Sequence, residues 1–116
     1  KKKKILEIWG SGKPKREVMY VDDIADACIY FMNKKTHHAL INVGTGKDMT
    51  INQFAKFIMK YFKVNLKIKN NKKMPDGVNR KLLDVSLAKK LGWRYKTSLL
   101  EGLKKTHYYF LNSKSK

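Results

Sequence analysis

The segment from Trp9 to Asp23 constrains the fold more than any other part of this chain. The apolar residues of Ile5 to Trp9 predict a short strand, and two glycines, a serine and a proline within positions 10–14 are the residues that a sharp reversal needs. A second strand is predicted from Glu17 to Val21. The two aspartates that end the segment can cap the first free amides of a helix. The order is therefore strand, turn, strand, helix.

The same order returns further along the chain. Leu40 to Val43 is predicted as a short apolar strand, and the loop after it contains Gly44 and Gly46. Thr50 and Gln53 then form a capping box at the start of a helix. Strands that alternate with helices indicate the α/β fold class.

Several further elements are predicted by shorter signals. The helix that begins near Asp22 and ends near Asn33 is expected to bury Ile24, Cys28 and Phe31, which follow the helical period. The next predictions are an edge strand over Val64 to Lys69, a loop over Asn70 to Asn79 and a strand over Arg80 to Val85. A brief helix is then predicted that Ser86 caps and Gly92 closes, with Trp93 packing against it. A last helix is opened by Ser98 and Glu101, with Leu99, Leu103, Tyr109 or Phe110, and Leu111 as core residues.

Composition limits the class of protein. At 116 residues the chain has the size of one domain, and no apolar run is long enough for a membrane span. The chain begins on four lysines and shows no initiator Met or leader, so we expect a piece of a longer protein. One cysteine, Cys28, cannot form an internal disulfide, which fits a reducing compartment and predicts a cytoplasmic location.

The net charge of +18 would ordinarily suggest a nucleic-acid partner. However, only three of the 27 Lys and Arg residues are Arg, and the lysines are spread along the whole chain. Because reading of base edges depends largely on Arg, we expect no specific nucleic-acid binding. A basic nucleic-acid-binding module stays as an alternative, and its binding would weaken steeply with salt.

The motifs for nucleotide and metal chemistry are incomplete. Neither glycine loop has the spacing of a P-loop, and Met49 occupies the place of the third glycine of a dinucleotide fingerprint. Tyr30 and Lys34 match the Tyr-x-x-x-Lys spacing of reductases, but lysine is so abundant that chance explains the match. The histidines lack ligands at metal spacing, so no zinc site is expected. The residues therefore point to binding rather than to catalysis.

Five residues are candidates for that binding. Trp9 and Arg16 flank the first turn and offer a stacking surface beside a cation, which suits a phosphorylated ring compound. Asp76, Arg80 and Lys81 add a carboxylate and two cations on a loop, where binding residues are often found. The alternative is a packed indole, a solvated turn and a structural ion pair.

Four blocks of sequence carry a resemblance to a known family. The runs WGSGKPKREVMYVDDIADA, INVGTGKDMTI, PDGVNRKLLDVSLAKKLGW and SLLEGLKKTHYYFL resemble, in order and spacing, the C-terminal part of the GDP-L-fucose synthase family. That family belongs to the extended short-chain dehydrogenases/reductases. The resemblance spans Ile5 to about Asn112. It implies an α/β fold in which residues 1–116 form the substrate-binding lobe, and the N-terminal NADP-binding Rossmann domain is absent from this chain.

The resemblance also implies a function. Such enzymes epimerise GDP-4-keto-6-deoxy-mannose at C3 and C5 and reduce C4 with NADPH, which is bound mainly by the absent domain. The expected partners are a GDP-sugar, the chain's own Rossmann domain and a second copy in a homodimer. By matching position, Trp9, Arg16, Asp76 and Lys81 look like substrate-contacting residues, and Arg80 matches a family arginine. The catalytic residues of the family lie before the matched region, so none is expected here.

The chain departs from the family at two places. Met74 stands where many relatives have a basic residue before the PDG block, and the opening lysines follow no family pattern. Another nucleotide-sugar epimerase or dehydratase of the same superfamily is the alternative within this fold.

Overall fold

The computed structural model describes residues 4–113, so the opening lysines 1–3 and the end of the SKSK tail, for which fraying is predicted, lie outside the described residues. Although the length predicts one domain, the described residues group into two compact units. Unit 1 contains residues 4–17 and 47–82, and unit 2 contains residues 18–46 and 83–113. Each unit is therefore built from two stretches that are distant in sequence.

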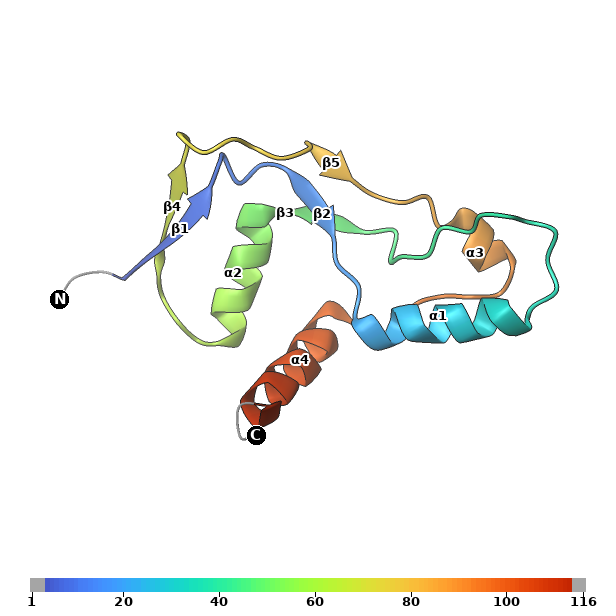
Figure 1. Ribbon diagram of the computed structural model, residues 1–116. Helices are drawn as coiled ribbons and strands as arrows, with labels where there is room; N and C mark the ends of the chain where they lie inside the picture. Colours follow the sequence, from blue (N-terminus) through green and yellow to red (C-terminus); the bar gives the residue numbers. More distant parts are fainter. Residues whose placement is uncertain (1–3, 114–116) are drawn as a thin grey trace. The chain divides into compact units, whose positions relative to one another are not determined.

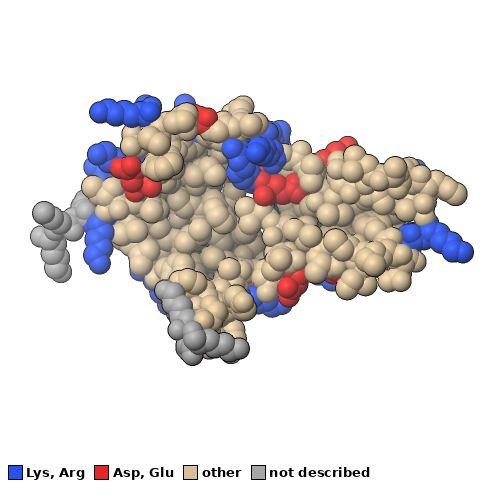
Figure 2. All heavy atoms as spheres, in the orientation of Figure 1, with Lys and Arg blue, Asp and Glu red and all other residues tan. Residues whose placement is uncertain are grey.

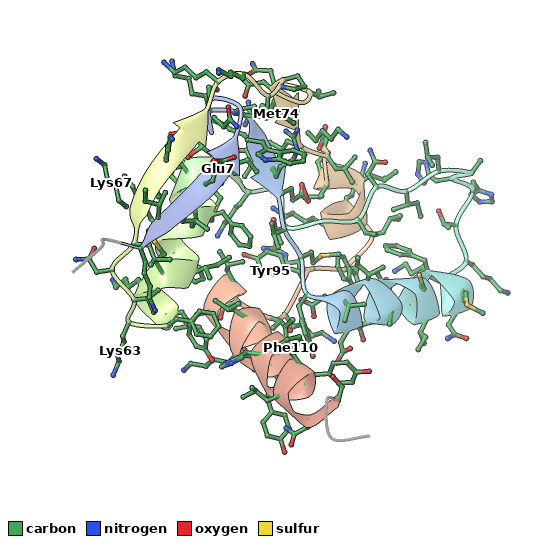
Figure 3. The ribbon with its side chains drawn as sticks, turned by 60° about the vertical axis from the view of Figure 1, so that its left-hand side comes forward. Glu7, Lys63, Lys67, Met74, Tyr95 and Phe110 are labelled. Carbon is green, nitrogen blue, oxygen red and sulfur yellow. The ribbon has the colours of Figure 1, made fainter. Side chains whose placement is uncertain are left out.

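A parallel strand pair and a helix form one half of unit 1. Strand β1 (Ile5–Trp9) pairs with β4 (Lys67–Asn71), and α2 (Ile51–Tyr61) lies alongside the pair (Figures 1 and 3). The predicted strand at Ile5 to Trp9 is confirmed. The other strand begins later than its predicted start at Val64, because the amide of that residue still donates to the Met59 carbonyl at the end of α2 (3.0 Å).

A small three-stranded sheet forms the other half of unit 1. Its order is β3 (Asp48–Thr50), β2 (Lys15–Glu17), β5 (Arg80–Lys81), with β2 antiparallel to β3 and parallel to β5. The predicted strand from Glu17 to Val21 is wrong in its position, because the residues that pair with β3 and β5 are Lys15 to Glu17, and only Glu17 belongs to the predicted range. The predicted strand from Arg80 is confirmed only for its first two residues.

The start of α2 follows the sequence prediction closely. The Thr50 hydroxyl accepts from the Gln53 amide (3.1 Å), and the Gln53 side chain accepts from the Thr50 amide (2.9 Å). The predicted capping box is thus confirmed. Since both halves of this motif lie within four residues, a local pattern is enough to find it.

Unit 2 consists of three helices and connecting loops. Helices α1 (Val21–Asn33), α3 (Ser86–Lys90) and α4 (Leu99–Ser113) are its elements (Figure 1). Its core is a cluster of Ala27, Ala88 and the indole of Trp93, which is 3% exposed. Trp93 also donates its ring N–H to a carboxylate oxygen of Asp26 (3.0 Å). The prediction that this tryptophan packs after a short helix is confirmed.

The first turn of α1 differs from the prediction. Tyr20 is the N-cap residue, and no side chain caps the helix. Asp23, expected as a cap, is buried and accepts instead from the Thr97 amide (2.9 Å) and hydroxyl (3.1 Å). Ile24 and Cys28 are exposed rather than buried. The face of α1 that enters the core is therefore the neighbouring one, which carries Ala27.

Three further predictions are corrected in unit 2. Leu40 to Val43 forms no strand within the described residues: Ile41 and Val43 pack on the core as loop residues. The N-cap of α3 is Val85, not Ser86. In α4 the Ser98 hydroxyl accepts from the Glu101 amide (3.2 Å), as expected, but the proposed core residues at its end are exposed, namely Tyr109, Phe110 and Leu111.

None of the helices among residues 4–113 is both long and apolar enough to cross a membrane.

Candidate binding site

All five candidate binding residues lie in unit 1. They occupy four places: the end of β1, the middle of β2, the loop that leads into β5, and β5 itself. The fold therefore brings distant parts of the chain into one compact unit; Ser11 and Asp76, for example, are 65 positions apart. The sequence alone gives no distance between these parts.

Asp76 is held by the first turn. One carboxylate oxygen accepts from the Ser11 amide and the other from the Ser11 hydroxyl, both at 2.7 Å. Gly10, with φ +77°, makes this approach possible, since a Cβ there would lie 2.2 Å from the Asp76 Oδ1 atom. The amide of Gly10 also donates to the Asn71 carbonyl at the end of β4 (2.9 Å). The turn after β1 is thus tied to both β4 and the following loop.

Arg16 is held by the same loop, two residues further on. Its Nη1 atom donates to the Val78 carbonyl (2.6 Å) and to the Lys15 carbonyl (2.7 Å). Both of these bonds use Nη1 alone, and Nη2 lies over Gly77, where a Cβ would be only 2.9 Å away. Arg16 is half-buried as a residue, and its guanidinium is fixed in direction, which prepares an Arg for bidentate contact with an anion.

The three-stranded sheet sorts the basic residues onto two faces. Arg16, Met49 and Lys81 are register partners on adjacent strands, so their side chains share one face. Lys15, Thr50 and Arg80 share the other face. Lys81 is exposed beside Arg16 and adds a second positive charge on that side.

Arg80 is engaged in an ion pair. Its Nε atom donates to Oδ2 of Asp48 at 2.6 Å, and the Asp48 side chain is only 9% exposed. This pair spans the sheet from β3 to β5 across β2. It therefore fixes the short strand that carries Lys81.

Trp9 is largely exposed to solvent. It ends β1 opposite Asn71, and 68% of it is accessible to solvent. An exposed indole at the end of a strand is free to stack on a ring, in contrast to the packed indole of Trp93. Met74 lies in the loop beyond β4 (Figure 3), and its amide donates to the Asn71 carbonyl (3.1 Å). An uncharged side chain therefore stands close after the end of this strand.

Acid is expected to loosen unit 1. Hydrogen bonds from the Ser11 hydroxyl and amide lower the pKa of Asp76 below its ordinary 3.8, and the hydrogen bond from Arg80 does the same to the pKa of Asp48. A carboxyl with a lowered folded-state pKa binds its proton more readily in the unfolded chain, so its stabilisation is complete above 3.8 and is lost as the pH falls through the lower value.

Thermal unfolding between pH 6 and pH 2 measures this effect. We expect the midpoint temperature of unfolding to fall when the pH drops below about 4, the range in which such carboxyls take up protons. In Asp48→Asn the unfolding temperature should fall less steeply with decreasing pH, because the variant lacks one of the titrating groups. An unchanged slope in that variant would show that the Arg80 pair contributes nothing to acid sensitivity.

The distribution of charge does not form a continuous basic stripe on the face drawn in Figure 2. Lys and Arg side chains there stand at separate places with uncharged residues between them. Among the described residues, no group of three His, Cys, Asp or Glu side chains comes together in a way that could hold a metal ion.

Tyr30 and Lys34 serve the packing of unit 2. The Tyr30 hydroxyl donates to the Leu91 carbonyl (2.7 Å), and the Lys34 ammonium lies 3.5 Å from the hydroxyl oxygen. The hydroxyl therefore anchors α1 to the end of α3.

Two residues of the site escape sequence analysis. Ser11 holds Asp76, and Asp48 holds Arg80, at separations of 65 and 32 residues. Ser11 reads as an ordinary turn serine and Asp48 as a residue before a capping box, so neither has a local signal of its partner. Only the fold brings each pair together.

Comparison with known proteins shows which family this chain resembles. Residues 1–44 match the model of the NAD dependent epimerase/dehydratase family. The chain is 39% identical to a putative GDP-L-fucose synthase 2 of Arabidopsis thaliana, covering 91% of this chain and 32% of that protein. The structure superposes on a GDP-6-OMe-4-keto-L-xylo-heptose reductase from C. jejuni with a TM-score of 0.84 at 32% identity, covering 95% of this chain and 34% of that one.

A UDP-glucose 4-epimerase from Thermotoga maritima is also similar, with a TM-score of 0.78 and 34% identity over 94% of this chain and 35% of the epimerase. These likenesses confirm the predicted fold class, which is the α/β fold of the extended short-chain dehydrogenases/reductases. Within that class, the predicted resemblance to GDP-L-fucose synthase is confirmed. The chain spans about a third of the length of the curated relatives it matches.

Proposed function

We propose that this chain is the substrate-binding portion of an enzyme of the GDP-L-fucose synthase type. The whole enzyme would epimerise GDP-4-keto-6-deoxy-mannose at C3 and C5 and reduce C4 with NADPH. The observation that carries the proposal is the fixed guanidinium of Arg16, whose register partner Lys81 adds a second cation on the same sheet face. Two cations on one face suit a diphosphate.

The five residues take different roles in this proposal. Arg16 and Lys81 bind the diphosphate, and the exposed ring of Trp9 stacks against the nucleotide sugar. Arg80 positions β5 through its pair with Asp48, and Asp76 holds the loop that meets Arg16. The reacting hexose would then point toward catalytic groups outside these 116 residues.

The cofactor would be bound by a separate part of the protein. NADPH supplies hydride for the reduction at C4, and this chain contains no complete Gly-x-G-x-x-Gly fingerprint. We therefore propose an N-terminal Rossmann domain in the whole enzyme, with which Leu40 to Val43 would pair as an added strand. A homodimer in the cytoplasm completes the proposal, and this chain alone should not turn over substrate.

A turnover assay on the product of the complete reading frame tests this function. NADPH oxidation, followed at 340 nm, should depend on added GDP-4-keto-6-deoxy-mannose. The reaction should yield GDP-L-fucose, identified by mass and by NMR of the sugar. Absence of both NADPH consumption and epimerisation in a folded full-length protein would refute the proposal.

A UDP-sugar epimerase or dehydratase is the second candidate, favoured by the likeness to the Thermotoga maritima epimerase. The same assay separates the two. A UDP-sugar enzyme would convert UDP-glucose or its 4-keto derivative and leave the GDP-sugar unchanged.

An apolar stripe on α1 predicts self-association of this chain when it is produced alone. Val21, Ile24 and Met32 are 66%, 44% and 84% exposed, and the exposed Cys28 lies on the same side of the helix. We propose that the Rossmann domain covers this stripe. Without it, sedimentation should show a mass that rises with concentration.

Neighbouring residues of α1 offer a matched pair of variants for this prediction. Met32→Lys introduces a charge into the stripe and should reduce the association, whereas Asn33→Lys adds the same charge beside it and should not. A monomer at all concentrations, or equal effects of the two changes, would show that the stripe does not drive association.

A further inference from the structure

The contact between Ser11 and Asp76 does more than close a turn. Both carboxylate oxygens accept a hydrogen bond from one residue, at 2.7 Å each, and the Ser11 hydroxyl also accepts from the Lys13 amide (3.2 Å). A backbone amide is rigid, and the hydroxyl is fixed by two partners. The carboxylate therefore has a defined position relative to the turn that follows β1.

That position is transmitted along the chain to Arg16. Asp76 is followed by Gly77, which lies under the guanidinium, and by Val78, whose carbonyl accepts from Nη1 (2.6 Å). The next carbonyl, of Asn79, accepts from the Lys15 amide (2.9 Å). The three residues that follow Asp76 therefore all contact β2.

We infer that Ser11 and Asp76 form a clip that positions Arg16. Asp76 then acts on the ligand through the guanidinium that it helps to aim, and Ser11, which the resemblance does not single out, is the second half of the device. The inference rests on the proposed function, in which Arg16 binds the diphosphate. Ser11 and Asp76 are positioning residues, since the clip supplies no group to the ligand.

The alternative is direct contact between Asp76 and a hydroxyl of the sugar. An exposed carboxylate has lone pairs beyond the two that Ser11 occupies, so geometry alone permits it. The two accounts differ in what happens when Arg16 is absent. If Asp76 only positions Arg16, losing Asp76 has no further effect on affinity once Arg16 is absent. If Asp76 contacts the sugar directly, its loss lowers the affinity by the same factor with or without Arg16.

A double-mutant cycle on the full-length protein distinguishes them, with GDP-mannose as the probe and calorimetry as the readout. We expect Asp76→Ala to weaken binding about tenfold when Arg16 is present and less than about twofold in the Arg16→Ala background. Ser11→Ala should have a smaller effect of the same kind, and Ser11→Thr, which restores the hydroxyl, should bind like the parent. Equal losses in both backgrounds would overturn the inference.

Unit 2 contains a matched control for the chemistry of the clip. Asp23 accepts from the amide and the hydroxyl of Thr97, as Asp76 does from Ser11. Thr97→Ala therefore removes a hydroxyl-to-carboxylate bond in the unit that contains none of the five candidate binding residues. It should lower the unfolding temperature without changing the affinity for GDP-mannose, and a matching loss of affinity would show that the effect of Ser11→Ala is general destabilisation.

A second readout needs no ligand. In the full-length protein, nitrogen NMR can follow the side-chain N–H signal of Arg16, identified by its loss in Arg16→Ala, with the signal of Arg80 as an internal reference held by Asp48. Ser11→Ala and Asp76→Ala should speed water exchange at Arg16 and leave Arg80 unchanged. Unchanged exchange at Arg16 would overturn the inference. If the parent protein binds no GDP-mannose, the proposed function fails, and these signals still decide whether the clip exists.

Discussion

Arg16→Ala should weaken the binding of GDP-mannose by about 10- to 100-fold, which corresponds to the roughly 1.5–3 kcal/mol of a hydrogen bond to a charged group. The loss is expected to be large because the guanidinium is fixed by two backbone carbonyls and its remaining nitrogens are aimed before the ligand arrives. Calorimetric titration of the full-length protein measures it.

Two further arginine variants sharpen this result. Arg94→Ala removes the same charge from an exposed position in unit 2 and should leave the affinity unchanged. Arg16→Lys keeps the charge but lacks the planar fork, so it should recover only part of the affinity. If Lys restores binding fully, Arg16 contributes only its charge, and the aimed geometry has no role.

Trp93→Ala should cost about 3–5 kcal/mol of unfolding free energy, the usual range for removing a buried aromatic side chain. Among the described residues, the indole is the one large side chain that is buried in the core cluster of unit 2, and the other buried members are two alanines. Its removal also leaves Asp26 without the hydrogen bond from the ring N–H. Urea unfolding followed by circular dichroism gives the free energy, and the expected loss is large enough to unfold unit 2.

Trp93→Phe separates the two contributions. Phenylalanine keeps most of the apolar volume and loses the ring N–H, so its cost should be well below that of alanine. The pKa of Asp26, which is lowered mainly by this hydrogen bond, should rise toward 3.8 in that variant. If Trp93→Ala costs less than about 1 kcal/mol, a value typical of surface changes, the core of unit 2 does not depend on this indole.

Local signals in the sequence predict much of the secondary structure. The strand from Ile5 to Trp9, the capping box of Thr50 and Gln53, and the helix that ends at Asn33 depend on neighbours within a few residues, and all are present. The misplaced elements depend on distant partners. The strand at Lys15–Glu17, for example, exists because β3 and β5 pair with it.

The buried face of α1 shows why burial was harder to predict. A helical period identifies apolar residues on one side, such as Ile24 and Cys28, but α1 has apolar residues on two adjoining sides. The tertiary contacts select the side with Ala27, which packs against Trp93. The sequence contains no information within the helix itself that decides between the two sides.

The candidate site divides in the same way. Trp9, Arg16 and Lys81 are predicted as binding residues from residue type, spacing and family resemblance. Their supports, Ser11 and Asp48, were not, because each acts on a residue more than 30 positions away. Residue types suggest which groups could bind a ligand, whereas the groups that hold them in place emerge only from the fold.

The most direct test of this account is a calorimetric titration of the full-length protein with GDP-mannose, beside UDP-glucose and the Arg16→Ala variant. The account predicts saturable binding at one site per chain, weaker binding of UDP-glucose, and a marked loss of affinity in the variant. No saturable binding of GDP-mannose, or an affinity that Arg16→Ala leaves unchanged, would contradict a GDP-sugar site built around Arg16.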